Sequence, residues 1–266
     1  MEAPELLVRD EGHVRCLTMN RPQSKNGLTR ELLGALAAAL RETAIAAEAG
    51  EVRAVLLSGA GGNFSSGADL RAGLSLADHP GGAAAALEES LRVYYHGTIR
   101  ALRHVGAPVL AFIDGAAVGF GCDLALACDL RVGTAKARLG EIFVKRGLMP
   151  DGGGTFLLPR IVGLGRALEL MFVGDMIESA EALQLGILNR IVADEAAAIA
   201  YAQRIAAGPP LVLREVKRAV YASLSRPFDA ALEAEVDGQL RLLGSADFAE
   251  GVTAFFAKRP PEFQGK

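Results

Sequence analysis

Two apolar stretches of the sequence, each predicted to be a strand, lead into a glycine-containing loop that opens a helical stretch. The first covers residues 52–58, with the loop at 63–70 (NFSSGADL), and the second covers residues 109–113, with the loop at 115–123 (GAAVGFGCD). The first N–H groups of a helix lack partners within it and carry a partial positive charge. Two such loops side by side would hold one developing oxyanion between two backbone N–H groups. The alternative is that both are ordinary tight turns, since glycine punctuates loops generally.

The rest of the chain predicts a fold of the α/β class. Further strands are predicted at residues 14–19 and 130–132, and helices at 28–49 and 83–102, where Leu and Ala recur at helical spacing. A helix is also expected to begin near Leu124. Strands that alternate with helices are typical of a mixed core. From about residue 195 onward the pattern is helical, so we expect an α/β core over 1–194 and a helical region over 195–266.

Charge and composition exclude several classes of function. The chain has 28 basic and 31 acidic residues, a net charge of −3, which gives no electrostatic footprint for nucleic acid. Its most apolar stretch, residues 108–118, is interrupted by Asp114 and is too short to span a membrane. The N-terminus lacks the apolar core of a signal peptide. The three cysteines and four histidines show no metal-ligand spacing, so we expect a cytoplasmic protein without a metal site.

The glycine loops also fail the common nucleotide-binding patterns. Gly119 and Gly121 follow a predicted strand, but Leu124 stands where the dinucleotide fingerprint needs a third small residue. The sequence contains no G-x-x-x-x-G-K-[ST] and no G-x-S-x-G motif. A nicotinamide-dependent oxidoreductase is therefore disfavoured.

Taken in order, the motifs resemble those of the enoyl-CoA hydratase/isomerase (crotonase) superfamily over essentially the whole chain. They lie at residues 20–26, 64–70, 119–125, 147–155, 158–163, 174–180 and 250–259. The resemblance implies a crotonase-like spiral of repeated ββα units with a C-terminal helical oligomerisation region, forming a homotrimer or homohexamer. It also implies an acyl-CoA thioester substrate and no separate cofactor, because coenzyme A is part of the substrate.

The resemblance assigns an oxyanion hole to the backbone N–H groups of Ala68 and Phe120. Phe120 replaces the usual middle glycine, which keeps the donor but reshapes the acyl pocket. Once polarised in such a hole, the thioester has an acidic α-carbon, and a positioned carboxylate can move a proton there through an enolate. The remaining positions implied in substrate binding are Lys25, Asn26, Ser66, Ala68, Asp69, Leu70, Gly119, Phe143 and Lys258.

Hydratases of this superfamily use two glutamates, and neither is present here. Asp123 occupies the first position and Phe143 the second. Phe143 cannot transfer a proton. Asp123 is one methylene shorter than glutamate, and a misplacement near 1 Å can cost about a hundredfold in rate. Asp123 remains a second catalytic candidate beside a purely structural role.

Asp151 is the first candidate for the acid/base group. Residues 143–160 and 247–259 resemble the ring 1,2-epoxyphenylacetyl-CoA isomerase type of bacterial phenylacetate degradation, in which the aspartate of Pro-Asp-x-Gly-Gly is taken as the base. A single carboxylate suffices to carry a proton between C2 and C4. The alternative for Asp151 is a helix N-cap. Of the other acids, Asp129 is predicted to be structural and Glu141 to line the pocket mouth.

Three functional hypotheses follow. The first is a CoA-thioester isomerase that relocates a double bond or rearranges a ring epoxide, with catalytic residues Asp151, Asp123, Ala68 and Phe120. The second is an enoyl-CoA hydratase that works with Asp123 and Asp151. The third, of another class, is a non-catalytic acyl-CoA-binding oligomer.

Overall fold

Two β-sheets form the centre of the molecule, which the computed structural model describes over residues 3–69 and 80–266. The larger sheet has the strand order β1-β2-β3-β4-β6-β9. Only β1 and β2 pair antiparallel, and the other neighbours are parallel. The smaller sheet has the order β5-β7-β8. The strands are β1 (Leu6–Glu11), β2 (Val14–Met19), β3 (Ala54–Gly59), β4 (Val109–Ile113), β5 (Ala116–Val118), β6 (Leu130–Gly133), β7 (Arg138–Gly140), β8 (Ile177–Glu178) and β9 (Arg190–Ile191).

Consecutive strands divide between the two sheets and are followed by a helix. β4 lies in the larger sheet and β5 in the smaller one, and α5 (Phe120–Ala127) follows them. β6 and β7 repeat this arrangement before the 3₁₀ turn η4 (Ile142–Arg146) and α6 (Gly154–Val162). This confirms the predicted spiral of ββα units. In each unit the chain passes from the larger sheet to the smaller sheet before it enters the helix.

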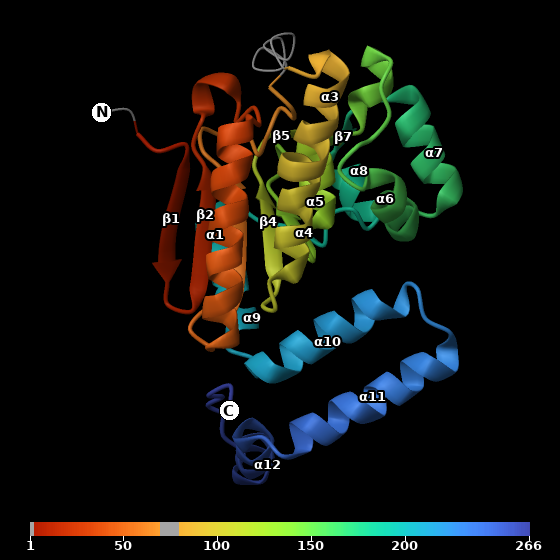
Figure 1. The fold of residues 1–266 in the computed structure, drawn as a ribbon. Coiled ribbons are helices and arrows are strands. Elements are labelled where there is room, and N and C mark those ends of the chain that lie inside the picture. The colour runs from red at the N-terminus through yellow and green to blue at the C-terminus, as the bar shows by residue number, and fades with distance from the viewer. Residues whose placement is uncertain (1–2, 70–79) are drawn as a thin grey trace.

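Helices cover both faces of the larger sheet (Figure 1). α1 (Arg30–Glu48) packs with α4 (His96–His104) on one face, and α9 (Glu195–Ala206) packs on the other. Successive residues of a strand point to opposite faces. Accordingly, Val55 and Leu57 belong to the larger core cluster, whereas Ala54 and Leu56 belong to the cluster that includes the alanines of α9. A strand buried on both faces reads as one continuous apolar run, which is why β3 was predictable.

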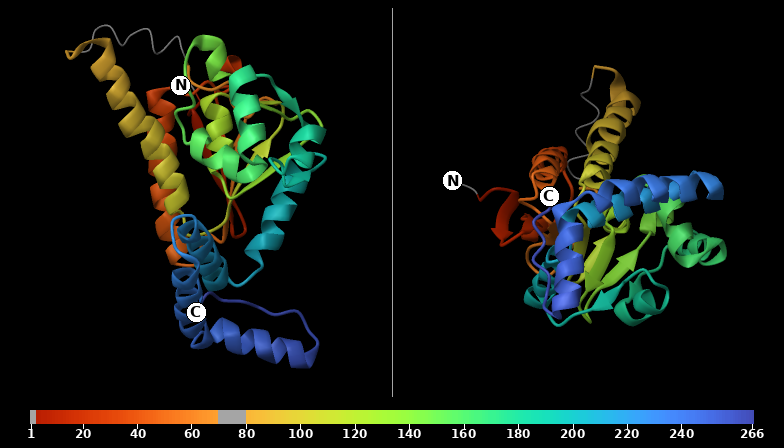
Figure 2. Two further views of the ribbon diagram at one scale, coloured as in Figure 1. Left: turned by 90° about the vertical axis from the view of Figure 1, so that its right-hand side faces the viewer. Right: turned by 90° about the horizontal axis from the view of Figure 1, so that it is seen from below.

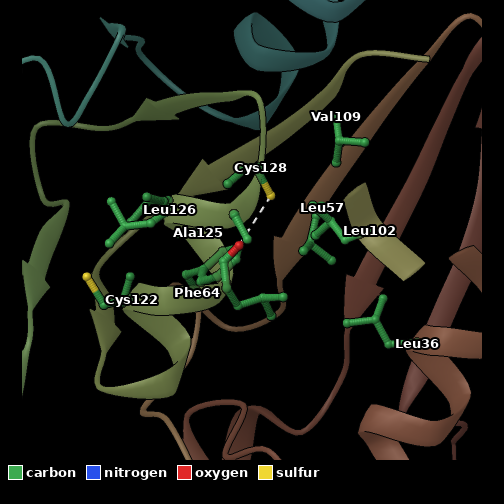
Figure 3. Packing of buried hydrophobic residues seen from close by; sticks show 14 of the residues in the cluster. Leu36, Leu57, Phe64, Leu102, Val109, Cys122, Ala125, Leu126 and Cys128 are labelled. Carbon is green, nitrogen blue, oxygen red and sulfur yellow. Dashed lines mark hydrogen bonds between the residues drawn. The ribbon is translucent and has the colours of Figure 1, made fainter. Parts of the chain in front are cut away.

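The larger core cluster includes residues of both glycine loops, among them Phe64 and Cys122 (Figure 3). Phe64, in the first loop, is fully buried together with Leu36 of α1, Leu57 of β3 and Leu102 of α4. Burial of each such side chain contributes on the order of 2 kcal/mol. The first loop is therefore anchored in the core at its start.

The predicted elements match the structure with three differences. The expected helix at 83–102 runs from Gly82 to His104 but is wound as a π-helix, η3 (Ser90–Tyr95), between α3 (Gly82–Glu89) and α4. The helix expected from Leu124 begins four residues earlier, at Phe120. The strands β1, β5, β7, β8 and β9 were not predicted, because β1 is an edge strand with mostly exposed side chains and each of the others has only two or three residues.

Helices α10 (Pro210–Ser223), α11 (Phe228–Leu243) and α12 (Ala246–Ala257) extend away from the core (Figures 1 and 2). Asp129 fastens α10 to the core: its carboxylate lies 2.6 Å from Lys217 Nζ and accepts a 2.5 Å hydrogen bond from Tyr221. It also accepts the Val109 N–H at 2.7 Å, which agrees with the structural role predicted for it. Within residues 3–69 and 80–266 no helix is long and apolar enough to cross a membrane. The remaining helices are η1 (Pro22–Ser24), α7 (Leu164–Val173) and α8 (Ser179–Gln184).

Candidate active site

The two glycine loops lie side by side and are joined by backbone hydrogen bonds. The Ser65 N–H donates to Ala116 O at 2.9 Å, and the Val118 N–H donates to Ser65 O at 3.0 Å. On its other side the first loop pairs with Leu28, whose N–H donates to Gly67 O at 2.8 Å. The arrangement expected from the sequence is therefore present, and the loops are more than isolated turns.

This pairing brings the N–H groups of Ala68 and Phe120 close together. Leu28 bonds to the residues on either side of Ala68, so the Ala68 N–H points away from that bridge. Phe120 is the first residue of α5, where an N–H has no acceptor within the helix. In the described part of the chain neither group donates to a protein acceptor. Two N–H groups without a protein acceptor thus lie on adjoining segments of the paired loops.

Gly67 allows this close approach. Its φ is +88°, and a Cβ on it would lie 2.6 Å from Val118 O and 3.5 Å from Phe120 N. A side chain cannot be placed there without moving one loop away from the other. The separation of the two donors is therefore set by the missing side chain of Gly67.

Aromatic side chains surround the donors. The Phe120 ring is buried and meets the Tyr95 ring edge-on, with centroids 4.5 Å apart. Phe143 of η4 is also buried, and its ring tip would lie 3.9 Å from a Cβ placed on Gly119. Position 143 therefore contributes apolar surface and no proton donor or acceptor.

Asp151 presents a half-buried carboxyl close to these rings. Its Oδ1 is buried and has no hydrogen-bond partner in the described residues. Burial raises its pKa to about 6, and the nearby His96 partly offsets this rise. His96 Nε2 donates to the backbone oxygen of Asp151 at 2.9 Å, which fixes the loop and leaves the carboxyl free.

The alternative role of Asp151 as a helix N-cap is wrong. Helix α6 begins at Gly154, its N-cap is Gly153, and no side chain caps it. Gly153 has a φ of +99°, which turns the chain between Asp151 and the helix. Because of this turn the Asp151 carboxyl is not bound to the first N–H groups of α6.

Asp123 lies in the first turn of α5 and is fully buried. Its Oδ2 accepts the Gly152 N–H at 2.7 Å, whereas its Oδ1 has no partner among the described residues. Burial is the main cause that raises its pKa to about 7, and the charge of Asp151 adds to it. The Gly152 hydrogen bond acts in the opposite direction.

The sequence predicted that Glu141 lines the pocket mouth. The structure shows instead that Glu141 is buried, with 3% of its surface exposed. It directly follows Gly140 of β7, whose end is buried, and Gly154 leaves room for its carboxyl. Neither of its carboxyl oxygens has a partner in the described chain. Burial and the charge of Asp123 raise its pKa well above the usual range.

These buried acids predict that the protein loses stability as the pH rises. The pKa of Asp123 is 3.8 ordinarily and about 7 in the folded protein, so the folded state binds more protons between these values and stability falls across this window. We expect Asp123→Asn to remove a penalty on the order of 4 kcal/mol at pH 8 and to flatten the decline. Urea unfolding at pH 4, 6 and 8 measures this. The exposed Glu42→Gln is the control, and equal pH slopes for wild type and Asp123→Asn would contradict the prediction.

The predicted coenzyme A positions fall into two groups. Lys25 and Ser66 are exposed next to each other, with the Ser66 N–H bonded to Lys25 O at 2.9 Å. Asn26 is instead fully buried, and its side chain donates to Ala60 O and Asn63 O at 2.9 and 2.8 Å, so it holds the first loop in place.

The other three predicted positions differ in their surroundings. The Asp69 carboxylate accepts a 3.0 Å hydrogen bond from Arg21 Nη1. Leu70 lies outside the described residues. Lys258 is exposed at the end of α12. This helix lies at the opposite end of the molecule from β5 and α5, which flank the second glycine loop (Figure 1).

Sequence reasoning missed Tyr95 and His96. No spacing pattern links His96 to a carboxylate, because residues 96 and 151 meet only through tertiary packing. The π-helical segment immediately before His96 gives no sequence signal that we recognised, although such segments are frequent at functional sites. The structure shows no group of three or more His, Cys, Asp or Glu suited to a metal ion over the described ranges, 3–69 and 80–266.

Comparisons with known proteins agree with this arrangement. A family model described as enoyl-CoA hydratase/isomerase matches residues 9–266. The 1,2-epoxyphenylacetyl-CoA isomerase of Escherichia coli is 36% identical, with 98% of each chain covered. The short-chain-enoyl-CoA hydratase of Clostridium acetobutylicum is 31% identical, also with 98% of each covered. The crystal structure of an enoyl-CoA hydratase from Bacillus anthracis superposes with a TM-score of 0.92 at 30% identity, covering 99% of this chain and 100% of that one.

Proposed function

The chain belongs to the enoyl-CoA hydratase/isomerase family, and we propose that it is an isomerase that moves a double bond of an acyl-CoA thioester from the 3-position to the 2-position. The observation that carries this proposal is the set of acid/base groups. One partly exposed carboxyl, Asp151, precedes Gly152, which lies against the Phe120 ring, and Phe143 occupies the position of the second glutamate of hydratases.

In the proposed reaction the thioester oxygen binds between the N–H groups of Ala68 and Phe120. Both donors are fixed by backbone hydrogen bonds of their loops, so they need not reorganise as negative charge develops on the oxygen. Donors of this kind stabilise an enolate more than the neutral ester, and this difference lowers the barrier to removing a proton from C2. Coenzyme A is part of the substrate, and the reaction requires no further cofactor.

Asp151 carries the proton in this scheme. Its carboxylate takes a proton from C2, and the C–H electron pair enters the conjugated enolate. The enolate then takes the proton back at C4, which leaves the double bond between C2 and C3 and regenerates the carboxylate. A base with a pKa of about 6 is ionised at neutral pH, yet still strong enough to accept the proton.

Hydration is less well supported by the same residues. Adding water requires one group to activate the water and another to protonate the α-carbon. Asp123, which stands at the first glutamate position, is fully buried and accepts the Gly152 N–H. Only Asp151 has an exposed portion, so the pair that hydration needs is incomplete at the pocket surface.

A ring-epoxide thioester is the second candidate substrate. The Tyr95 ring is partly exposed where it meets the buried Phe120 ring, so it offers aromatic surface beside the second loop, and such a surface packs well against a ring. The 36% sequence identity to the Escherichia coli 1,2-epoxyphenylacetyl-CoA isomerase also supports a ring-epoxide thioester as substrate.

We also propose that the C-terminal helices assemble a homotrimer or homohexamer. Phe228, Leu240, Phe255 and Phe256 are 65–78% exposed, which is unusual for large apolar side chains. Assembly would cover these surfaces and could bring Lys258 of one copy to the coenzyme A bound by another. Sedimentation velocity distinguishes a monomer from a trimer and a hexamer.

Product analysis tests the proposed function. The purified protein is incubated separately with a 3-enoyl-CoA, a 2-enoyl-CoA and a ring-epoxide CoA thioester, and the products are identified by chromatography and mass spectrometry. We expect the 3-enoyl-CoA to give 2-enoyl-CoA, with little 3-hydroxyacyl-CoA from either enoyl substrate. Rapid formation of 3-hydroxyacyl-CoA would favour a hydratase, and binding of all thioesters without turnover would favour a non-catalytic acyl-CoA-binding protein.

A further inference from the structure

Behind Asp151 two carboxyls face the same small space in the protein interior. Asp123 and Glu141 are 0% and 3% exposed. A Cβ on Gly154 would collide with Asp123 Oδ1 and lie 3.1 Å from Glu141 Oε1, so both oxygens border the space left by this glycine. Neither oxygen accepts a hydrogen bond from an N–H or hydroxyl group in the described protein, and the two carboxyls interact with each other.

No positive charge compensates this pair. The side chains that act most strongly on Asp123 and Glu141 are each other, Asp151 and Cys122, and no lysine or arginine is among them in the described residues; the backbone N–H groups of Gly152 and Asp151 favour the ionised form of Asp123. The groups on the Asp151 side are His96 and Tyr95. Two buried carboxylates without a cation cannot both be ionised, so the stable state is one acid and one carboxylate that share a single proton.

A cavity lies on the other side of Glu141. It has a volume of about 10 Å³, close to the minimum for one water molecule, and Glu141 is one of its lining residues. Most of the other residues around it are apolar, including Leu126, Leu139 and Leu158. Three lining residues, Leu170, Asp175 and Ile177, also border a hollow of about 270 Å³ on the outer surface. The cavity is thus separated from solvent by a thin layer of side chains.

We propose that Asp123 and Glu141 relay protons between Asp151 and solvent through this rear cavity. The relay rests on the proposed function, because it exchanges the proton that Asp151 removes from the substrate. Asp123 is linked to the Asp151 loop by its hydrogen bond from Gly152, the next residue in the chain. Glu141 contacts no substrate in this scheme and acts only through Asp123.

The proton balance is simple. After Asp151 has taken a proton from C2, one proton passes from Asp151 to Asp123, and the proton shared by the pair leaves Glu141 for solvent through the cavity. The pair keeps one proton and one negative charge throughout. In the reverse direction a solvent proton enters at Glu141, and one leaves Asp123 for Asp151, which then protonates C4. No bond other than those to hydrogen changes.

The relay has a measurable consequence in heavy water. Without it, a single base that returns the same proton transfers hydrogen from C2 to C4 inside the closed complex. With it, deuterium from solvent reaches Asp151 during turnover and appears at C4 of the 2-enoyl-CoA product. The ratio of deuterium incorporated to product formed measures the competition between proton exchange at Asp151 and return of the original proton to C4, so kcat is measured beside it for each variant.

The experiment follows isomerisation of 3-enoyl-CoA in D₂O by wild type, Glu141→Gln and the exposed control Glu42→Gln, with products analysed by NMR at C4. We expect deuterium in the wild-type and control products and at least a fivefold lower incorporation per turnover with Glu141→Gln. Glu141→Asp, which keeps a carboxyl, is expected to restore part of the exchange. Asp123→Asn interrupts the other end of the relay and should lower incorporation in the same way, which keeps the test decisive if Glu141→Gln does not fold.

The outcomes separate the relay from the proposed function. Isomerisation with no deuterium at C4 in wild type would overturn the relay, as would Glu141→Gln and Asp123→Asn products that match wild type. Absence of any isomerisation by wild type would overturn the proposed function, and the relay with it.

Discussion

Replacing Asp151 with asparagine is expected to lower kcat for isomerisation of 3-enoyl-CoA by about 10²- to 10⁴-fold, the range typical of losing a general acid/base group. Asparagine has nearly the same shape but cannot accept a proton at C2. The carboxyl makes no hydrogen bond through its buried Oδ1, and it does not cap α6, so we expect the variant to fold normally. Steady-state kinetics with circular dichroism as a folding check measure the effect.

The matched control is Asp10→Asn. Asp10 is an exposed aspartate that pairs with Arg15 at 2.9 Å on the surface, so its replacement should leave kcat within about twofold, as surface changes usually do. Full isomerase activity of Asp151→Asn would contradict the assignment of this residue as the proton carrier.

The dependence of kcat/KM on pH tests the role of Asp151 independently. Its carboxylate form is the active one, and burial raises its pKa to about 6. We therefore expect kcat/KM of wild type to be constant above this value and to fall about tenfold per pH unit below it.

Replacing Gly67 with alanine is expected to lower kcat by about 10²- to 10³-fold, the cost typical of losing one oxyanion donor. The new Cβ would lie 2.6 Å from Val118 O, a contact that forces the two loops apart. Because Ala68 and Phe120 lie on different loops, their N–H groups would no longer converge on one oxygen. Affinity for free coenzyme A should change much less, since the thioester oxygen is absent from it.

Gly12→Ala is the control for this substitution. Gly12 also has a positive φ, +63°, but a Cβ there would have nothing within 4 Å. Both variants therefore carry a similar backbone strain of about 1 kcal/mol, and only Gly67→Ala carries the clash. Equal activities of the two variants would show that the spacing of the loops does not matter.

The sequence was sufficient to predict the strands that lie in the core. Residues 109–113 of β4 and 14–19 of β2 were predicted at the bounds seen in the structure, because a buried strand is encoded by its own apolar residues. Both glycine loops were also predictable, since a strand, a glycine turn and a helix follow one another locally. β1 was missed because its side chains are mostly exposed.

The surroundings of the acids could not be predicted from local patterns. Glu141 follows a three-residue strand, and nothing nearby in the sequence indicates that Gly154 leaves space for its carboxyl. His96 reaches Asp151 across 55 positions of sequence through helix packing. The free energy that determines such contacts is spread over many tertiary interactions, whereas sequence periodicity reports only which face of an element is buried.

One ratio tests most directly whether the protein is an isomerase: kcat/KM of wild type for isomerisation of a 3-enoyl-CoA, divided by kcat/KM for hydration of the corresponding 2-enoyl-CoA. A pocket with one accessible carboxyl and Phe143 at the second glutamate position should isomerise much faster than it hydrates, by about a hundredfold or more. A ratio at or below one would contradict the account, because the protein would then be a hydratase despite these residues.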